Sequence, residues 1–403
     1  MQTTRPNEFI ALIAVLTAMV AMSIDTMLPA VGVIATELHA ANANDRQFIV
    51  LFFFLGLTFG QLIFGPMSDS VGRKPTIYSG LVIYVAGSLL CVFATNYPMM
   101  MAGRLLQGFG AAAPRVAALA MVRDGAKGAD MARVMSFVMS VFMLVPILAP
   151  SIGQVVLYVA NWRYIFGGFV VAAGLTATWM HLRQSETLAP ENKRPISVAE
   201  LWSGAMEVFR NPLAMGYTLA GGFIFSAFTT YLGTSQQIFA EQYQQGDKFA
   251  LWFGGLAIAI AIAMIVNGNL VRKIGMRTIS KQALRGFLVI WFCLLGFTAL
   301  YAGHPPLPIF GLFLLGSFFC SGLLFGNFNS IAMEPMGHVA GMAAAISGFI
   351  SSLMAVIFGG IAGRLYDGTL YPITIAFVIF GVFMWLTTEW AEAKRESVKK
   401  SIA

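Results

Sequence analysis

Charged residues are scarce in this chain of 403 residues, because Asp, Glu, Lys and Arg together make up only 11% of it. A soluble domain carries about 25% charged residues, whereas 58% of this chain is hydrophobic. A water-soluble fold of this composition would expose large apolar surfaces. The composition therefore predicts an integral membrane protein. The formal charge of +7 is typical of basic loops beside a membrane, and no basic stretch interleaved with aromatic residues predicts binding to nucleic acid.

Cysteine and histidine are also rare. The three cysteines lie far apart in apolar runs, and no two of the four histidines have the spacing of metal ligands. This argues against a disulfide framework and predicts neither a metal nor a cofactor. The sequence contains no GxxxxGK[ST], GxSxG or HExxH motif. We therefore expect neither an ATP-driven pump nor an enzyme, which leaves gradient-driven or passive transport.

Long apolar runs fill most of the sequence. A membrane-spanning helix needs about 20 mostly apolar residues, and this criterion predicts twelve spans in an all-α integral membrane protein. With the N-terminus in the cytoplasm, 18 loop cations face inward and four face outward, so both termini are expected in the cytoplasm. The predicted spans cover residues 9–34, 47–67, 76–95, 98–122, 133–157, 163–182, 212–238, 249–271, 280–301, 307–332, 339–363 and 370–391.

The chain contains an internal repeat. Gly65 and Gly72 lie seven residues apart with a cation behind them, and Gly268 and Gly275 repeat the pattern 203 residues later. A polar segment separates the sixth span from the seventh. We expect an N-terminal six-helix bundle over residues 1–185, a cytoplasmic linker over 186–211 and a pseudo-symmetric C-terminal bundle over 212–403. Transporters are commonly built from such repeats, with the substrate site near the midplane between them.

Three ionisable residues are predicted deep inside the spans: Asp25, Arg104 and Arg115. A charge at such a position is expensive and usually faces a cavity or a partner. At 1.5 Å per residue, Asp25 lies about 24 Å from the inner start of its span and Arg104 about 9 Å from the outer start. In a core about 30 Å thick these depths nearly coincide. An Asp25–Arg104 ion pair would offset the desolvation cost; in the simpler alternative it only holds the bundle together.

Arg115 lies eleven residues after Arg104, which returns it to the same helix face. We expect both arginines to point into one cavity, although Arg115 could equally reach the inner interface or form a structural pair. Asp25 is the only deep carboxylate. It could bind either a proton or a cationic substrate, and each event would loosen the arginine pair, so Asp25 is the expected coupling residue.

Four motifs resemble signatures of the major facilitator superfamily. The segment from Gly65 to Lys74, GPMSDSVGRK, resembles its loop between spans two and three. The segment that begins Arg104-Leu-Leu-Gln107-Gly108 resembles the span-four signature of its drug/proton antiporters. Pro146-Ile-Leu-Ala-Pro150-Ser-Ile-Gly153 resembles their span-five motif. Asp25-Thr-Met-Leu-Pro29 resembles the span-one motif of the Bcr/CflA family of bicyclomycin, chloramphenicol and florfenicol exporters.

This resemblance implies a proton-coupled antiporter that exports small amphipathic drugs or metabolites from the cytoplasm by alternating access. It implies a bacterial inner membrane, with protons, a small molecule and the lipid bilayer as partners and no nucleic acid; we expect a monomer. Asp25 would couple the proton to the substrate with Arg104 as its partner. Gly65, Asp69, Gly72, Arg73 and Lys74 would form an inner gate, in which Asp69 meets the start of span eleven. Pro146, Pro150 and Gly153 would bend span five.

The substrate cavity should be lined by adaptable apolar side chains and a few polar ones. In a chain with 34 Phe and 23 Met, such residues could instead face lipid or pack between helices. The expected lining consists of Asp25, Gln107, Arg115, Met139, Phe142, Phe225, Phe228, Tyr231, Gln236 and Asn327.

Two other functions fit the sequence less well. An uptake carrier or uncoupled facilitator for a small metabolite is the first, and Arg104 and Arg115 would suit an anionic one. The antiporter-like span-five motif argues against it. The second is a membrane receptor or scaffold, but the chain offers no sizeable soluble domain to pass on a signal.

Overall fold

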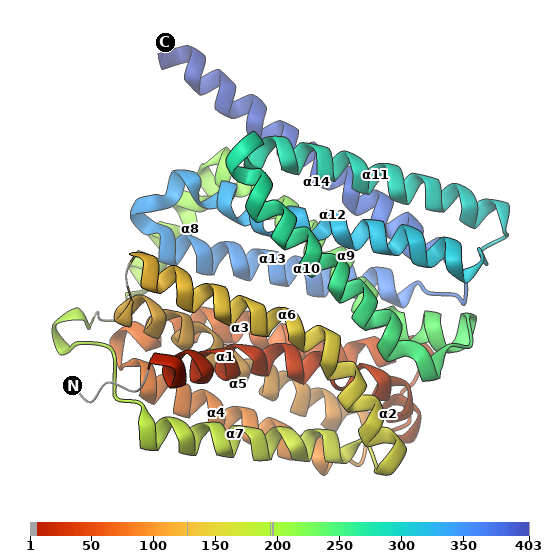
Figure 1. Cartoon of the computed structure of the whole chain (residues 1–403), viewed down its shortest axis with the longest axis horizontal. Coiled ribbons are helices and arrows are strands. Elements are labelled where there is room, and N and C mark those ends of the chain that lie inside the picture. The colour runs from red at the N-terminus through yellow and green to blue at the C-terminus, as the bar shows by residue number, and fades with distance from the viewer. Residues whose placement is uncertain (1–5, 127, 194, 196, 403) are drawn as a thin grey trace. The chain divides into compact units, whose positions relative to one another are not determined.

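The computed structural model describes residues 6–126, 128–193, 195 and 197–402 (Figure 1). Three cations used in the charge prediction, Arg5, Lys127 and Arg194, lie outside these residues. The described residues contain helices and no strand. Twelve helical segments are long and apolar enough to span a membrane, which confirms the predicted all-α fold and the number of spans.

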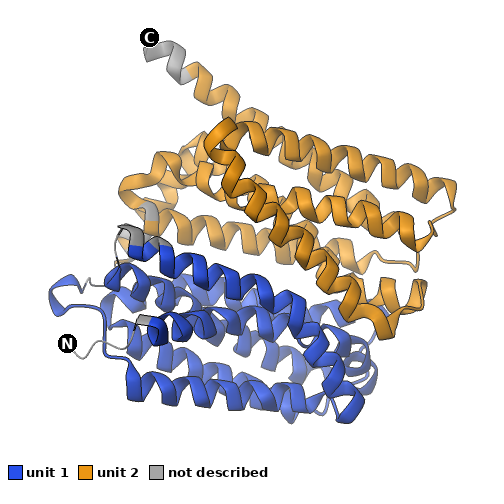
Figure 2. Ribbon diagram, in the orientation of Figure 1, with its two compact units in different colours: residues 1–196 blue, residues 197–403 orange. Residues whose placement is uncertain are grey.

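The chain divides into two compact units, residues 1–196 and residues 197–403 (Figure 2), and each is described by itself. In each unit the long helices lie side by side (Figure 1). The main helices of unit 1 are α1 (Pro6–Asp25), α2 (Val31–Glu37), α3 (Phe48–Ser70), α4 (Arg73–Val92), α5 (Tyr97–Gly125), α6 (Gly128–Val159) and α7 (Arg163–Arg183). Those of unit 2 are α8 (Val198–Arg210), α9 (Pro212–Gln237), α10 (Phe249–Ile274), α11 (Met276–Leu300), α12 (Leu307–Met333), α13 (Ala340–Arg364) and α14 (Tyr371–Ile402). The short helices are η1 (Leu28–Ala30), η2 (Ala43–Gln47), η3 (Pro190–Asn192), η4 (Ile238–Gln242), η5 (Gly246–Lys248) and η6 (Glu334–Val339).

Local sequence explains where two central helices begin. The side chain of Asn96 accepts a hydrogen bond from the backbone N–H of Met99 (2.9 Å) and caps α5. Asn211 caps α9 in the same way, accepting from the backbone N–H of Leu213 (3.0 Å). In both helices a proline occupies one of the first two positions, where its missing N–H costs nothing.

The first predicted span is broken in the middle. Helix α1 ends at Asp25, two turn residues follow, and the short helix η1 and then α2 complete the span. Pro29 explains the break, because it cannot donate to the carbonyl of Asp25 and its ring would clash with that carbonyl in a continuous helix. The backbone N–H of Ala30 bonds instead to the carbonyl of Met27, at 2.9 Å. The break therefore places Asp25 beside irregular backbone.

Helix α5 forms the centre of unit 1 and packs against α3 and α4. Glycines at these contacts let the backbones approach closely; a Cβ on Gly108, for example, would lie 1.9 Å from the carbonyl oxygen of Phe53. This tight packing buries the α5 residues Arg104 and Gln107 completely.

The segment expected to be a linker contains a helix of its own. Helix α8 packs against α9 and α13 of unit 2. Val208 on α8 is buried with Ala214, Met336, Ala343 and Ile346. The boundary between the units, after residue 196, falls inside the expected linker, so the second half of that segment is packed as part of unit 2.

Candidate functional site

Asp25 ends helix α1 and is buried, with 5% of its surface exposed. Among the described residues, no hydrogen bond or ion pair involves its carboxylate. The hydroxyl of the adjacent Thr26 is also buried without a hydrogen-bond partner. Burying polar groups without partners is unfavourable, so this site does not exist for stability alone.

Arg104 does not form the predicted ion pair with Asp25. Its Nε donates to the carbonyl of Ile49 (2.8 Å), and its Nη1 donates to the carbonyl of Ser23 (3.2 Å) and to the side-chain oxygen of Gln107. Arg104 and Asp25 do lie at a similar depth, as predicted, since Arg104 contacts Ser23, two residues before Asp25. The predicted partner was wrong: the guanidinium donates to two backbone carbonyls and a side-chain amide, and not to a carboxylate.

Aromatic rings also surround the Arg104 guanidinium. Its central carbon lies 4.6 Å from the centre of the Phe53 ring and 5.8 Å from that of Phe166. Cation–π attraction of this kind is worth more when the charge is desolvated. Carbonyls and rings together replace the counter-ion, although the Nη2 of Arg104 is still buried without a partner.

A hydrogen-bond network ties this level of unit 1 together. Gln107 donates to the hydroxyl of Ser88 (2.8 Å), and Ser88 donates to the carbonyl of Tyr84 on the same helix, α4 (2.8 Å). The Tyr84 hydroxyl lies 2.6 Å from that of Ser23 on α1. Gln107, expected to line the substrate cavity, is thus fully buried and occupied with joining α5 to α4 and to Arg104.

The span-five motif meets the break in α1 directly. Gly153 on α6 lies so close to Thr26 that a Cβ on the glycine would be 1.8 Å from the Thr26 carbonyl oxygen. Pro146 and Pro150 lie inside the same helix. Each lacks the N–H that would bond one turn back. A helix weakened by two prolines therefore rests, through Gly153, on the backbone next to Asp25.

Arg115 is, after Asp25, the second charge at depth in the described spans of unit 1 without a partner. It lies three helical turns after Arg104 on α5, it is partly buried, and no hydrogen bond or ion pair is found for it among the described residues. Neither a structural pair nor a clamp like that of Arg104 explains this residue. At the depth of the spans, the described part of unit 1 therefore presents one negative side chain, Asp25, and one positive side chain, Arg115, to a ligand.

The repeated loop after α3 forms an ion-pair cluster. Arg73 contacts Asp69 within the loop and Asp124 near the end of α5, where Nε and Oδ2 are 2.8 Å apart. The Nη1 of Arg73 also donates to the hydroxyl of Ser68 (3.1 Å). The predicted contact of Asp69 with the start of span eleven stays a prediction. Gly65 has open space around it.

Glu186, which follows α7, completes this cluster. Its carboxylate accepts hydrogen bonds from the backbone N–H groups of Arg73 and Lys74, each at 3.0 Å. A carboxylate at a helix N-terminus is favourable because it meets free N–H groups and the positive end of the helix dipole. Gly72 has a φ of +131°, and a Cβ there would lie 2.7 Å from an oxygen of Glu186, so the turn requires glycine.

Three of the predicted lining residues in unit 2 lie together on α9. The rings of Phe225 and Phe228 stack with centres 6.4 Å apart. Tyr231 is fully buried and packs edge-on against Phe318, with centres 4.8 Å apart, while its hydroxyl has no hydrogen-bond partner. Gln236, further along α9, is partly buried. These residues form one aromatic cluster with a polar end.

Asn327 on α12 pairs with Asn267 on α10. Each side-chain amide donates to the other, at 3.1 Å and 2.8 Å, and Asn327 is 2% exposed. The sequence suggested a residue that faces a cavity, whereas the structure shows a reciprocal bond between helices. In unit 1, by contrast, Met139 and Phe142 lie exposed on α6.

Sequence reasoning missed some charged residues. Arg285 lies ten residues into α11, is exposed, and forms no ion pair with any described residue; it was not counted among the charges inside spans. Asp124 and Glu186 were missed as partners of the repeated loop. Both are acidic residues near the ends of predicted spans, on the same side of the membrane as that loop. This position in the sequence could have identified them as partners.

Comparison with known proteins gives consistent matches. The model of the Major Facilitator Superfamily matches residues 12–360. An uncharacterized MFS-type transporter, YdgK of Bacillus subtilis, is 28% identical over 345 residues, which cover 85% of each chain. A bicyclomycin resistance protein homolog of Haemophilus influenzae is 26% identical and covers 90% of this chain and 91% of its own. The multidrug resistance protein MdtL of Klebsiella pneumoniae is 26% identical over 84% of this chain and 86% of its own.

A solved structure shares the fold. The xylose transporter XylE of E. coli superimposes with a TM-score of 0.71 at 14% sequence identity, over 96% of this chain and 98% of that chain. The human organic anion transporter MFSD10 superimposes with a TM-score of 0.64 at 16% identity, over 96% of this chain and 100% of that chain. At these identities the likeness concerns the arrangement of helices alone.

Proposed function

The chain belongs to the major facilitator superfamily, and on that premise we propose that it is a proton-coupled antiporter that exports small amphipathic drugs or metabolites by alternating access. Membership makes the chain a multi-pass membrane transporter and not an enzyme, as predicted, with a small molecule and the lipid bilayer as partners. Relatives named for bicyclomycin and multidrug resistance support the direction of transport.

The observation that carries the proposal is the unpartnered carboxylate of Asp25 at the break in α1. No arginine neutralises it by direct contact, so it is free to take either a proton or the cationic group of a substrate. The two compete for one negative charge. A substrate that arrives from the cytoplasm displaces the proton, and a proton that arrives from outside displaces the substrate.

Arg104 acts in this mechanism as a positioning residue. It donates hydrogen bonds to the carbonyls of Ser23 and Ile49. These bonds join α1 to α3 just before the break. This fixes the position at which α1 ends without cancelling the charge of Asp25. A rigid frame around a free ionisable group is what a coupling site requires.

The contact between Thr26 and Gly153 gives Asp25 a route to the rest of unit 1. When Asp25 gains or loses a proton, the free-energy cost of burying its side chain at the break in α1 changes. Any shift of the Thr26 backbone must also displace α6, because the Thr26 carbonyl packs directly against Gly153. Pro146 and Pro150 make α6 the helix in which such a shift costs least.

The remaining assignments belong to the same proposal. The protein lies in a bacterial inner membrane as a monomer, with bundles over residues 1–185 and 212–403, a linker over 186–211, and both termini in the cytoplasm. The loop from Gly65 to Lys74 acts as the inner gate. The substrate contacts Asp25 and Arg115, the exposed Met139 and Phe142, and the aromatic cluster of α9.

Transport by purified protein in liposomes with an imposed pH gradient tests the proposal. The panel contains phenicols, lipophilic cations and anionic metabolites, and Asp25→Asn serves as the matched variant. We expect a drug-like compound to move uphill only in the wild type and only with the gradient, while Asp25→Asn still exchanges it downhill. If Asp25→Asn accumulates the compound as the wild type does, Asp25 is not the coupling residue.

One observation favours a second function. The unpartnered, partly buried Arg115 would suit an anionic solute, as expected of an uptake carrier or uncoupled facilitator. In the same liposomes, such a carrier would equilibrate an anionic metabolite without a pH gradient. Arg115→Gln would then abolish that flux, whereas Asp25→Asn would leave it unchanged.

A further inference from the structure

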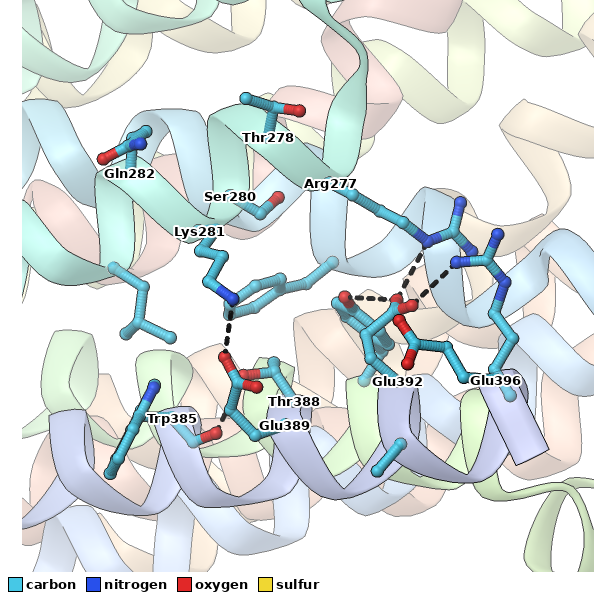
Figure 3. Close-up of a pocket in the computed structure, with 15 residues that line it drawn as sticks. Arg277, Thr278, Ser280, Lys281, Gln282, Trp385, Thr388, Glu389, Glu392 and Glu396 are labelled. Carbon is cyan, nitrogen blue, oxygen red and sulfur yellow. Dashed lines mark hydrogen bonds and ion pairs between the residues drawn. The ribbon is translucent and has the colours of Figure 1, made fainter.

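The pocket beside the repeated loop of unit 2 carries no net charge. Its lining comes from α9, α11, α12 and α14 and holds three cations and three carboxylates (Figure 3). Each cation forms an ion pair with a glutamate of the same lining. These charges neutralise one another and select no charged ligand. In unit 1, by contrast, the side chains of Gln47 and Thr26 are buried near the Asp25 level without partners.

Gln47 is the last residue of η2 and directly precedes α3. It is 1% exposed, and neither the oxygen nor the nitrogen of its side-chain amide has a hydrogen-bond partner in the described part of the chain. Thr26, at the break in α1, is 4% exposed, and its hydroxyl is unpartnered in the same way. Burying an amide without partners destabilises a fold. A functional role for Gln47 would offset that cost.

Arg104 places Gln47 relative to Asp25. Its guanidinium donates to the carbonyls of Ser23 and Ile49, and Asp25 lies two residues after Ser23 while Gln47 lies two residues before Ile49. Because α1 and α3 belong to consecutive spans, they run in opposite directions. Both steps therefore lead from Arg104 toward the same end of unit 1, the end that carries α2 and η2. Gln47 and Asp25 lie on the same side of Arg104 and at a similar depth.

Helix η2 is held firmly at that end. It packs against α2 and α3, and the hydroxyl of Tyr97 at the start of α5 donates to the carbonyl of Asp45 on η2. Asp45 uses its Oδ2 to cap η2 (3.1 Å), while its Oδ1 is buried without a partner. The other charged side chains of η2 and α2 are Arg46 and the ion-paired Glu37. Gln47 thus has a fixed position with polar groups on its outer side.

These groups have the chemistry of a path for protons. An amide offers one acceptor and two donors, and a hydroxyl offers both. A buried water typically makes about three hydrogen bonds to such groups, which Gln47 and Thr26 can supply. Neither side chain titrates, so neither competes with Asp25 for the proton. Asp25 is 5% exposed, and a proton needs polar groups of this kind to reach it.

We propose that Gln47 is a positioning residue on the route by which a proton reaches Asp25 from the end that carries α2 and η2. Gln47 and Thr26 hold a water between them. A hydronium ion that enters from that end gives one proton to this water, which passes one of its own to the Asp25 carboxylate. Asp25 becomes a carboxylic acid, and neutral water is left behind. The inference rests on the proposed role of Asp25 and adds the side from which its proton comes.

Infrared spectroscopy after a rapid drop in pH tests this route. Full-length protein is reconstituted in vesicles with the α2–η2 end facing outward, and the external solution is acidified. The carboxylic-acid band that is missing in Asp25→Asn reports the protonation of Asp25. A second set of vesicles with the opposite orientation receives the same acid at the other end of the protein. Melting temperatures are measured for every variant.

We expect Gln47→Leu to slow the protonation of Asp25 at least about tenfold when acid arrives at the α2–η2 end. In vesicles of the opposite orientation it should behave as the wild type does. Gln47→Asn retains the amide and should slow the reaction less, while Thr26→Val should also slow it. Gln61→Leu on α3 is the matched control and should change nothing, because the Gln61 amide bonds to its own helix at Leu57 (3.2 Å).

Stability separates this role from a structural one. Gln47→Leu removes a buried amide without partners, so it should melt at the wild-type temperature or above. The proposal is overturned if Gln47→Leu protonates Asp25 at the wild-type rate, or if it slows the reaction equally in both orientations.

Uphill transport in liposomes is measured separately with Asp25→Asn. Accumulation by that variant would overturn the coupling role of Asp25 and leave the route to it standing. A wild-type protonation rate in Gln47→Leu would overturn the route alone.

Discussion

Arg73 of unit 1 directly follows the second glycine of the repeated loop, Arg277 of unit 2 lies one position further on, and the two take partners at matching places. Arg73 contacts Asp124 near the end of α5, the fourth span, while Arg277 contacts Glu334 directly after α12, the tenth span. A carboxylate after the sixth span and one in the twelfth also contact these loops. Glu186 after α7 caps the backbone at Arg73, and a glutamate of α14 contacts the Arg277 side chain.

Inside the spans the two units differ. Unit 1 buries Asp25 and Arg104 and carries the partly buried Arg115. In the described spans of unit 2, the helices are joined by the neutral pair of Asn267 and Asn327 and by aromatic contacts. The two units therefore share the loop at the membrane surface but not the chemistry at depth. We propose for that reason that proton coupling belongs to unit 1.

The largest expected effect comes from replacing the deep charge of unit 1. Arg104→Leu leaves two carbonyls and a buried amide without their donors, and we expect it to destabilise the protein by about 3–5 kcal/mol. Asn327→Leu in unit 2 should cost only about 1–2 kcal/mol, for the unpaired Asn267. Thermal unfolding in detergent checks both variants. Equal losses would remove the distinction between the two units.

The contact between α6 and the break in α1 should be sensitive to a single methyl group. Gly153→Ala places a Cβ 1.8 Å from the Thr26 carbonyl, and forcing the helices apart should cost about 1–3 kcal/mol and lower uphill transport at least about tenfold. Gly268→Ala on α10 is the matched control, because nothing lies within 4 Å of its Cβ position. Liposome transport compares them. Full activity of Gly153→Ala would break the proposed link between Asp25 and α6.

The two loop glycines sharpen the comparison at the membrane surface. Gly72 and Gly275 both have positive φ, of +131° and +81°, so an alanine at either is strained by about 1–3 kcal/mol. Only at Gly72 would the new Cβ also collide with Glu186 and disturb the cap on α4. Gly72→Ala should therefore lower the melting temperature more than Gly275→Ala does. The reverse order would contradict the assignment of Glu186 as a structural cap.

The smallest expected effects concern the ion pairs of the two repeated loops. The Arg73 side chain is 7% exposed and that of Arg277 is 28% exposed. Asp124→Asn should cost about 1–2 kcal/mol, because it weakens a largely buried contact. Glu334→Gln should cost less than about 1 kcal/mol, as for exposed pairs. Melting curves at low and high salt distinguish them, since salt should reduce only the effect of Glu334→Gln.

Much of the fold follows from the sequence. Apolar runs of spanning length predicted all twelve spans, and the repeated glycine pair marked the two loops that the structure shows to be similar. Those features depend on composition along one helix or one turn. The helix within residues 186–211 was not predicted, because its apolar face is explained only by the α9 and α13 surfaces on which it packs.

The partner of Arg104 shows what the sequence could not supply. Rise per residue places two side chains at the same depth in a membrane, and it did so correctly for Arg104 and the end of α1. It does not give the direction in which each side chain points. Backbone carbonyls, which satisfy Arg104 here, are present at every residue and leave no mark in the sequence.

The most direct test of the central claim measures the proton itself. Purified protein in weakly buffered detergent is mixed with a transported cationic substrate, and the pH of the solution is recorded. If substrate and proton compete for Asp25, the wild type releases protons on binding and Asp25→Asn binds without releasing any. Proton release by Asp25→Asn equal to that of the wild type would show that another group couples transport, and the account of Asp25 would be wrong.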